Sequence, residues 1–491
     1  MKRIYKLTLL LTLCFTVATF GDWIAQEDNW YNVLIDGAKS GWAHEVVEVD
    51  SETKNIKSSK VQNMTLSRGG MEISIRVTSS FVETEDGKPI SVHSTQEAMG
   101  MVQDTIWEFG DEELKMTTVA GGTPIVKTVP LPKENWLTPQ SVKRMFTQKM
   151  ATGANAITYQ TMAPELGPSV ITVVMTKKGE KKQDVLGAEK LVLAWETVNN
   201  KMPVVGTEFY TLTGVSVGSA MNAGFGAIET IITPKFDALS PVNEVPELMV
   251  SLFVEPNKPI PSDTSKLTMR ITTKDGKKVD LPSVGMQKAT SNEDGSATLV
   301  VDLEAPISAT KEELVDGKYL GASAICDGTD DAVIAIAMEA LAPLPEDASS
   351  KAKALAIRSK IHAFIDEKNM STAFASASQT ARSKEGDCSE HAVLLCGVLR
   401  AAGIPSRGVM GMVYVPSMGG PNGVFGWHMW SQALIDGKWV DLDATLTTPY
   451  SVGHIATITS SLSDEDFGAE MGGILATIGN LEVEIVEEQE E

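Results

Sequence analysis

GDCSEHAVLLCGVLRAAGIP, residues 386–405, is the stretch of sequence from which the fold of the functional region can be worked out. Asp387 precedes Glu390 by three residues, which is the spacing of a capping box with Asp in place of Ser or Thr. A helix is therefore expected to begin at Cys388. It should end at Gly403, because a glycine shortly before a proline is a typical helix stop.

The start of this helix is a favourable place for a nucleophile. A thiol in the first turn faces unpaired backbone N–H groups and the positive end of the helix dipole, and both favour the thiolate form. Cys388 occupies this position and is the predicted nucleophile. Cys396 lies two turns further along the helix, lacks that help and is expected to pack in the core.

Residues 427–445, WHMWSQALIDGKWVDLDAT, form the second informative stretch. The pair Asp436–Gly437 is the strongest short signal for a β-hairpin, and apolar and aromatic residues flank it. Continuing the register from a two-residue turn sets Trp430 opposite Asp443. His428 is then a diagonal neighbour of Asp443 on one face, whereas a bulge that shifts the register by one residue would turn Asp443 away.

These two stretches predict a catalytic triad of Cys388, His428 and Asp443. Asp443 would accept a hydrogen bond from one ring nitrogen of His428, which leaves the other nitrogen to take a proton from Cys388. His391 also lies near Cys388 in sequence, but no carboxylate is placed to orient it. A structural hydrogen bond is therefore expected for His391.

Residues 386–415 followed by 427–445 resemble the core of the transglutaminase-like superfamily, whose catalytic order is Cys, His, Asp on a papain-like α+β fold. The matching positions are Cys388, His428 and Asp443. The resemblance implies acyl transfer on amide or peptide substrates through a thioester at Cys388, as a peptidase or amidase slightly more than as a cross-linking transglutaminase. It implies a protein or peptide substrate as the partner.

No cofactor or metal is expected. The chain has no calcium loop of EF-hand spacing, so the calcium control of animal transglutaminases is not carried over. A zinc site that recruits Cys388, His391, Cys396 and His428 would match no standard ligand spacing. For the oxyanion, the Cys388 backbone N–H is the natural first donor, and Gln379 is a candidate for the second.

The fold class predicted for the whole chain is multidomain, because 491 residues exceed what one core can serve. Residues 22–240 alternate short apolar segments with turn signals, which predicts a mostly antiparallel β domain with its clearest helix near residues 138–150. A proline-rich boundary opens a small β module at 241–329. Helical spacing begins in the last part, 330–491, the expected α+β papain-like catalytic domain.

The N-terminus, residues 1–21, has the pattern of a signal peptide: Lys2, Arg3 and Lys6 precede an apolar run at 7–20. The run is too short to span a bilayer, so we expect an exported protein, periplasmic or secreted, without a stable membrane span in its mature chain. The formal net charge of −22 excludes nucleic-acid binding by electrostatics.

Loss of Cys14 with the leader would leave three cysteines, Cys326, Cys388 and Cys396. An odd number in an exported protein means that one thiol stays free or pairs with another molecule. Cys326 and Cys396 could form a disulfide or remain two buried thiols. The alternative to an enzyme is an exported binding or scaffold protein that uses the papain-like domain for interaction only.

Overall fold

The computed structural model describes residues 22–486, with short gaps. The gaps are residues 69–70, 99–100, 121–123, 203, 224–225, 248–252, 368–374, 449, 465, 467–469 and 471–476. The predicted signal peptide, residues 1–21, and the last five residues lie outside the described part of the chain. Among the described residues, no helix is long and apolar enough to cross a membrane.

The N-terminal region is one antiparallel sheet of 14 strands in the order β8-β7-β6-β5-β4-β3-β2-β1-β14-β13-β12-β11-β10-β9. Its strands are β1 (Trp23–Ile35), β2 (Ala38–Asp50), β3 (Ile56–Arg68), β4 (Met71–Glu83), β5 (Pro89–Ala98), β6 (Met101–Phe109), β7 (Glu113–Ala120), β8 (Ile125–Pro130), β9 (Ala156–Met162), β10 (Val170–Val185), β11 (Ala188–Asn199), β12 (Gly206–Thr211), β13 (Ser216–Asn222) and β14 (Ala227–Ile232). The prediction of an antiparallel β region is confirmed.

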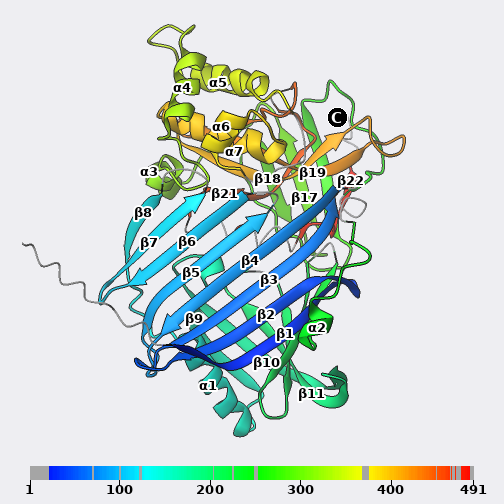
Figure 1. Cartoon of the computed structure of the whole chain (residues 1–491). Coiled ribbons are helices and arrows are strands. Elements are labelled where there is room, and N and C mark those ends of the chain that lie inside the picture. Colours follow the sequence, from blue (N-terminus) through cyan, green and yellow to red (C-terminus); the bar gives the residue numbers. More distant parts are fainter. Residues whose placement is uncertain are drawn as a thin grey trace, which may run out of the picture.

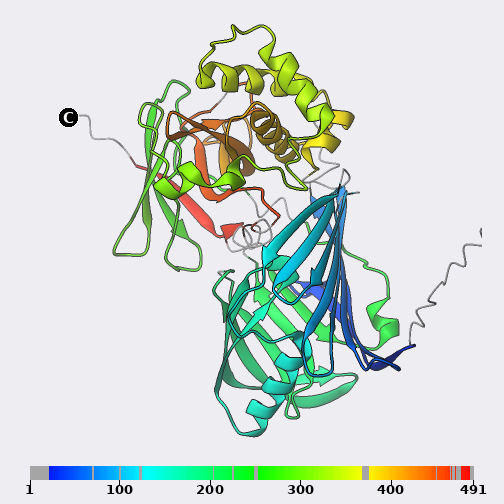
Figure 2. The same cartoon turned by 90° about the vertical axis from the view of Figure 1, so that its left-hand side faces the viewer.

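This sheet bends so that the strands of its first half, β1–β8, and those of its second half, β9–β14, form two limbs (Figure 2). The expected helix is present as α1 (Pro139–Ala151). It packs on the second limb, where the ring of Phe146 lies 5.3 Å from that of Trp195 and 4.4 Å from that of Tyr210. The short helices η1 (Pro164–Leu166) and α2 (Lys235–Ala238) complete this region.

The small β module is a four-stranded sheet in the order β16-β17-β15-β22. Its strands are β15 (Lys266–Thr273), β16 (Gln287–Ser291), β17 (Ala297–Asp302) and β22 (Leu481–Ile485). Strand β22 comes from the C-terminal segment and pairs with β15, so this module takes strands from both sides of the boundary predicted at residue 330. The alternating side chains of Leu481, Val483 and Ile485 are buried in the core of the module, which explains this pairing.

The C-terminal α+β region has helices packed on a four-stranded sheet in the order β20-β19-β18-β21 (Figure 1). Its elements are α3 (Lys311–Val315), η3 (Gly317–Tyr319), α4 (Asp331–Leu341), α5 (Ser350–Phe364), α6 (Ala377–Ser383), α7 (Cys388–Ala401), β18 (Ser406–Val415), β19 (Val424–Ile435), β20 (Lys438–Leu442) and β21 (His454–Ser460). Helix α7 contacts α4, α5, α6 and β19, and nearly all of its residues are buried.

Both local signals that define this region are present. The Asp387 side chain accepts from the backbone at the start of α7 and Glu390 reaches back to complete the capping box. Gly403 follows the end of α7 with a φ of 76°. Asp436 and Gly437 join β19 to β20 with φ values of 50° and 74°, as a two-residue hairpin with both central residues left-handed requires.

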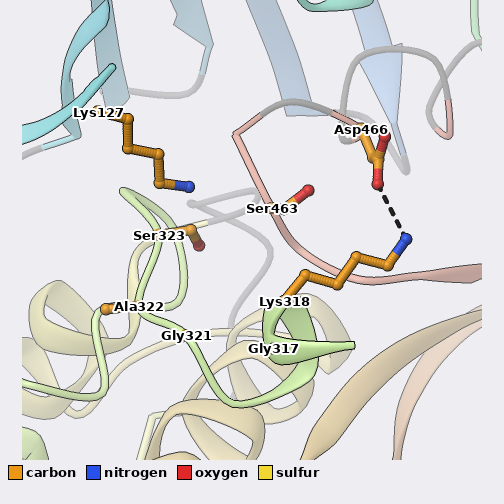
Figure 3. Close-up of a pocket in the computed structure, with 8 residues that line it drawn as sticks. All are labelled: Lys127, Gly317, Lys318, Gly321, Ala322, Ser323, Ser463 and Asp466. Carbon is orange, nitrogen blue, oxygen red and sulfur yellow. Dashed lines mark hydrogen bonds and ion pairs between the residues drawn. The ribbon is translucent and has the colours of Figure 1, made fainter. Parts of the chain in front are cut away.

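The N-terminal sheet meets the C-terminal region at a pocket of about 420 Å³ (Figure 3). Lys127 of β8 lies 3.4 Å from Asp464 across this seam. Lys318 of η3 lies 3.2 Å from Asp466 on the same lining. Cys388 does not line the pocket, and neither do the other two residues of the predicted triad, so we assign the pocket to domain contact.

Substitution of Gly437 by Ala tests the hairpin that carries the site. A Cβ at Gly437 meets nothing within 4 Å, so the cost is the strain of a left-handed residue, about 1 kcal/mol of unfolding free energy. Gly317→Ala is the matched control, because Gly317 also has open space but no positive φ. Urea unfolding followed by tryptophan fluorescence should separate the two variants, and equal loss in both would contradict this interpretation.

Candidate active site

Cys388 is the first residue of α7 and its side chain is half-buried. The Asp387 side chain accepts a hydrogen bond of 2.8 Å from the Ser389 backbone N–H and so fixes the start of the helix. The first N–H groups of a helix have no partner within the helix, and the backbone N–H of Cys388 is one of these. The thiol therefore lies beside a free donor at the helix end, as predicted.

His428 lies on β19, and Asp443 follows directly after β20. The observed pairs Ile435 with Lys438 and Ser431 with Leu442 have the register expected from the two-residue turn. The diagonal contact forms: His428 Nε2 lies 2.7 Å from Asp443 Oδ2, and both side chains are buried.

The other side of the imidazole faces the thiol. Cys388 is close enough to His428 to act on its protonation, and because Nε2 is on Asp443, Nδ1 is the nitrogen that remains for the thiol. Burial lowers the pKa of His428, but hydrogen bonds to Asp443 and Cys388 and their negative charges outweigh burial and raise it to about 10. The site thus favours a protonated His428 between the Asp443 carboxylate and the Cys388 sulfur.

Asp443 is fully buried and accepts four hydrogen bonds. Oδ1 accepts from the backbone N–H groups of Thr445, at 2.7 Å, and Leu446, at 3.2 Å. Oδ2 binds His428, at 2.7 Å, and His454, at 3.2 Å. Burial alone would raise the pKa of this carboxyl, yet the hydrogen bonds hold it well below its usual range. Asp443 therefore stays ionised although its side chain is not exposed to solvent.

His454 is the residue of this site that sequence reasoning missed. It begins β21, is fully buried, and its Nδ1 lies 3.2 Å from Ser451 Oγ. Its ring stacks on Tyr450 with 4.4 Å between centroids. The pairing of β21 with β18 that brings it to Asp443 spans about 40 residues, and no local turn signal predicts it.

Comparisons with known proteins agree with this geometry. Residues 338–444 match the family model described as transglutaminase-like superfamily. This part of the chain is a transglutaminase-like domain. None of the curated proteins matches the chain.

Three solved structures are similar to the chain at low identity. A β-barrel-like protein of a domain of unknown function from Brucella abortus is 10% identical over 42% of this chain and 94% of its own, with a TM-score of 0.33. A candidate cysteine protease from Cytophaga hutchinsonii is 18% identical over 49% and 90%, with a TM-score of 0.30. A candidate protease from Parabacteroides distasonis is 12% identical over 72% and 65%, with a TM-score of 0.18.

Residues of the small β module make hydrogen bonds to the β19–β20 hairpin and to β21 of the transglutaminase-like region. Asp441, buried in the hairpin, accepts from Trp430 Nε1 at 2.9 Å and from the Met286 backbone N–H at 3.0 Å. The Trp430 ring lies nearly parallel to that of His428, with 6.2 Å between centroids. The Gln287 side chain makes two hydrogen bonds to the backbone of Ala456 on β21, which holds the strand of His454 in place.

The other two cysteines in the described part of the chain, Cys326 and Cys396, are free thiols. Cys326 and Cys396 are buried in the same core and form no disulfide, so of the two alternatives left by the sequence the structure has the buried thiols. Burial raises the pKa of Cys326 to about 12 and raises that of Cys396. Neither thiol can compete with Cys388 as a nucleophile.

Two other candidates near the site have structural roles. His391 Nδ1 lies 2.7 Å from the carbonyl oxygen of Asp387, as expected for a structural hydrogen bond. Gln379 Oε1 accepts from the Ser376 backbone N–H at 3.0 Å and so caps α6. The structure therefore gives Gln379 a capping contact, and its role as a second oxyanion donor stays a prediction.

The acidic residues at the start of α7 oppose negative charge on the thiol. Glu390 is fully buried, and burial, together with the charge of Asp387, raises its pKa to about 7. A helix dipole contributes about 0.3–1 kcal/mol near its end, and two neighbouring carboxylates offset such a contribution. The protonated His428 ring is the positively charged group next to the Cys388 sulfur.

One group of side chains among the described residues has the spacing of metal ligands: His428, Asp443 and His454, whose ligand atoms lie within 4.8 Å of one another. Both histidines use Nε2 to bind the same oxygen of Asp443. A metal ion would have to replace both hydrogen bonds and would separate His428 from its role beside Cys388. We therefore assign the group to hydrogen bonding.

Alkylation by iodoacetamide tests the ion pair. Because His428 keeps its proton up to pH about 10, Cys388 should react quickly from pH 6 to 9 in the wild type. His428→Ala should slow the reaction at pH 6 at least about tenfold, the equivalent of about 1.4 kcal/mol. A rate that follows an ordinary thiol, whose pKa is about 8.5, in both proteins would contradict the ion pair. Cys396→Ala serves as the control.

His454 can be tested as a positioning residue with two substitutions. His454→Phe keeps the ring beside Tyr450 but removes one of the four hydrogen bonds to Asp443, so the Cys388 alkylation rate at pH 6 should fall about fivefold. His454→Gln retains a donor and should recover most of the rate. If both variants lose the rate equally, or neither does, His454 serves packing only.

Proposed function

We propose that this protein catalyses cysteine-dependent acyl transfer on amide or peptide substrates through a thioester at Cys388. The observation that carries the proposal is the buried hydrogen bond between His428 and Asp443, next to the Cys388 thiol at the start of α7. It lies within the transglutaminase-like domain, and the part of the chain that matches this superfamily contains all three residues.

The reaction follows from the protonation states at the site. The Cys388 sulfur attacks the carbonyl carbon of the amide, and the carbonyl oxygen takes up the negative charge. When the C–N bond breaks, His428 gives its Nδ1 proton to the leaving amine, and a thioester remains on Cys388. Asp443 keeps the ring oriented throughout by holding Nε2.

The second half of the reaction needs an acceptor. Water or an amine gives a proton to His428 and attacks the thioester carbon, which releases an acid or a new amide and regenerates the thiolate–imidazolium pair. The half-buried position of Cys388 leaves the thiol within reach of solvent, which favours hydrolysis. A peptidase or amidase is therefore the form we favour slightly, with transglutaminase cross-linking as its alternative.

Charge stabilisation of the oxyanion would begin with the Cys388 backbone N–H at the start of α7. The capping box already holds the start of α7 in place. No side chain therefore has to move before this N–H group can donate to the oxyanion. The export of the protein, through the predicted signal peptide at residues 1–21, is part of the proposal and places the reaction outside the cytoplasm.

A scaffold protein is the second function that we considered. Such a protein would gain nothing from a fully buried carboxylate bound to two histidines, because burying an ionised group costs free energy unless every partner is in place. Asp443 and its two histidines lie beside the half-buried thiol of Cys388, and this combination favours an enzyme over a scaffold.

Mass spectrometry of the intact protein tests the proposal. After incubation with a panel of peptides, with and without an added primary amine, we expect acyl adducts confined to Cys388 in the wild type. Cys388→Ala should carry none, whereas Cys396→Ala should carry the same adducts, because Cys396 is buried. Release of free acid indicates hydrolysis, and amine-linked product indicates cross-linking. No adduct over a broad panel would favour the scaffold.

A further inference from the structure

The N-terminal sheet encloses a second cavity, far in sequence from the triad. Its volume is about 820 Å³, within the range of small-molecule sites in proteins. Residues of β1–β4 line it from one limb of the sheet, and residues of β9, β10, β12 and α1 line it from the other. No step of the proposed acyl transfer uses this space.

One part of the lining is polar and its charges are mostly compensated. Tyr31 donates a hydrogen bond of 3.3 Å to Glu45, and Lys60 lies 3.1 Å from the same carboxylate. At the edge of the cavity Lys143 forms an ion pair with Glu27. The first three residues lie on β1, β2 and β3, and only the Lys143–Glu27 pair joins α1 to the first limb.

Glu208 does not itself line the cavity, but it precedes the lining residue Tyr210 by two positions on β12 and so lies on the same face of the sheet. It is opposite Trp195 in the β11–β12 pairing, and Trp195 contacts the cavity residue Phe146. Among the described residues, no hydrogen bond or ion pair is made by its carboxylate, although the charges of Lys60 and Glu45 act on it. Burial, the largest cause, raises the pKa of Glu208 to about 7.

Two tyrosines next to Glu208 also have open hydroxyls. Tyr159 and Tyr210 line the cavity, and the charge of Glu208 acts on both. Within the described part of the chain neither hydroxyl makes a hydrogen bond to another residue. Aromatic rings around an acidic group are the usual surroundings of a bound ammonium group, because the ring faces and the carboxylate both attract a cation.

The rest of the lining suits an apolar body. Its side chains include Val47, Phe81, Phe146, Met162 and Met175. Methionine and aromatic side chains adapt to irregular apolar ligands. A ligand that fits the whole cavity therefore has one positively charged end and an apolar remainder.

We propose that the cavity between the limbs of the N-terminal sheet binds a small amine with an apolar body, with its ammonium group between Glu208, Tyr159 and Tyr210. The inference concerns a site separate from the acyl-transfer centre and stands whether or not that chemistry is confirmed. The ammonium group is the positively charged partner that the Glu208 carboxylate lacks. The hydroxyl oxygens of Tyr159 and Tyr210 can turn towards the same ammonium group.

Calorimetric titration of the full-length protein with octylamine tests the proposal, with octanol as the neutral match and octanoate as the anionic one. Octylamine should bind to one site, and the other two should bind at least about tenfold more weakly, which is what one charged hydrogen bond contributes. Equal binding of octylamine and octanol, or no binding of octylamine in the millimolar range, would overturn the proposal.

Variants then locate the site. Glu208→Gln should reduce the affinity for octylamine at least about tenfold at pH 8, whereas Glu189→Gln, an exposed carboxylate of the same sheet, should leave it unchanged. Thermal unfolding checks that both variants are folded. Cys388→Ala should bind octylamine like the wild type, which separates this site from the catalytic one. Unchanged binding by a folded Glu208→Gln protein would overturn the assignment.

The pH dependence gives an independent readout. Glu208, with its raised pKa, is protonated below pH about 7, and the cation needs the ionised form. Affinity should therefore rise severalfold from pH 6 to pH 8, with proton release on binding at pH 7. The other charged or titratable groups that face Glu208 are Glu45, Lys60 and the tyrosines Tyr31, Tyr159 and Tyr210. Affinity that does not change with pH, or that falls, would contradict the role of Glu208.

Discussion

The site depends on one constraint, the burial of an ionised Asp443. A carboxylate without solvent is stable only if its oxygens are fully hydrogen-bonded, and Asp443 meets this with two backbone N–H groups and two histidines. In return its charge holds the proton on His428 and turns that ring towards Cys388. Removal of any one of these partners leaves a buried charge without compensation, so the fold around it has little freedom.

The surrounding helices and strands hold the hydrogen-bond partners of Asp443 in place. The hairpin of β19 and β20 fixes His428 relative to Asp443, and α7 brings Cys388 to the ring. The small β module, through Gln287 and Met286, fixes β21 and the hairpin from behind. Strand β22, the last described strand of the chain, completes this module by pairing with β15.

The local part of this arrangement could be predicted from the sequence. The capping box, the glycine after α7 and the Asp436–Gly437 turn act over a few residues, so Cys388 and the contact of His428 with Asp443 follow from short spacings. His454 and β22 could not be predicted, because their pairings join strands far apart in the chain and depend on the packing of whole modules. The 14 strands were predicted as a β region, but their bend and the cavity within it depend on tertiary structure.

The most direct test of the central claim is the protonation state of His428, measured by nitrogen NMR of the protein labelled in its histidines and assigned with His428→Gln. We expect both ring nitrogens of His428 to carry protons at pH 8 in the wild type, and the proton to be lost at lower pH in Asp443→Asn. A His428 that is neutral at pH 8 and titrates near the ordinary value of about 6.5 would contradict the account.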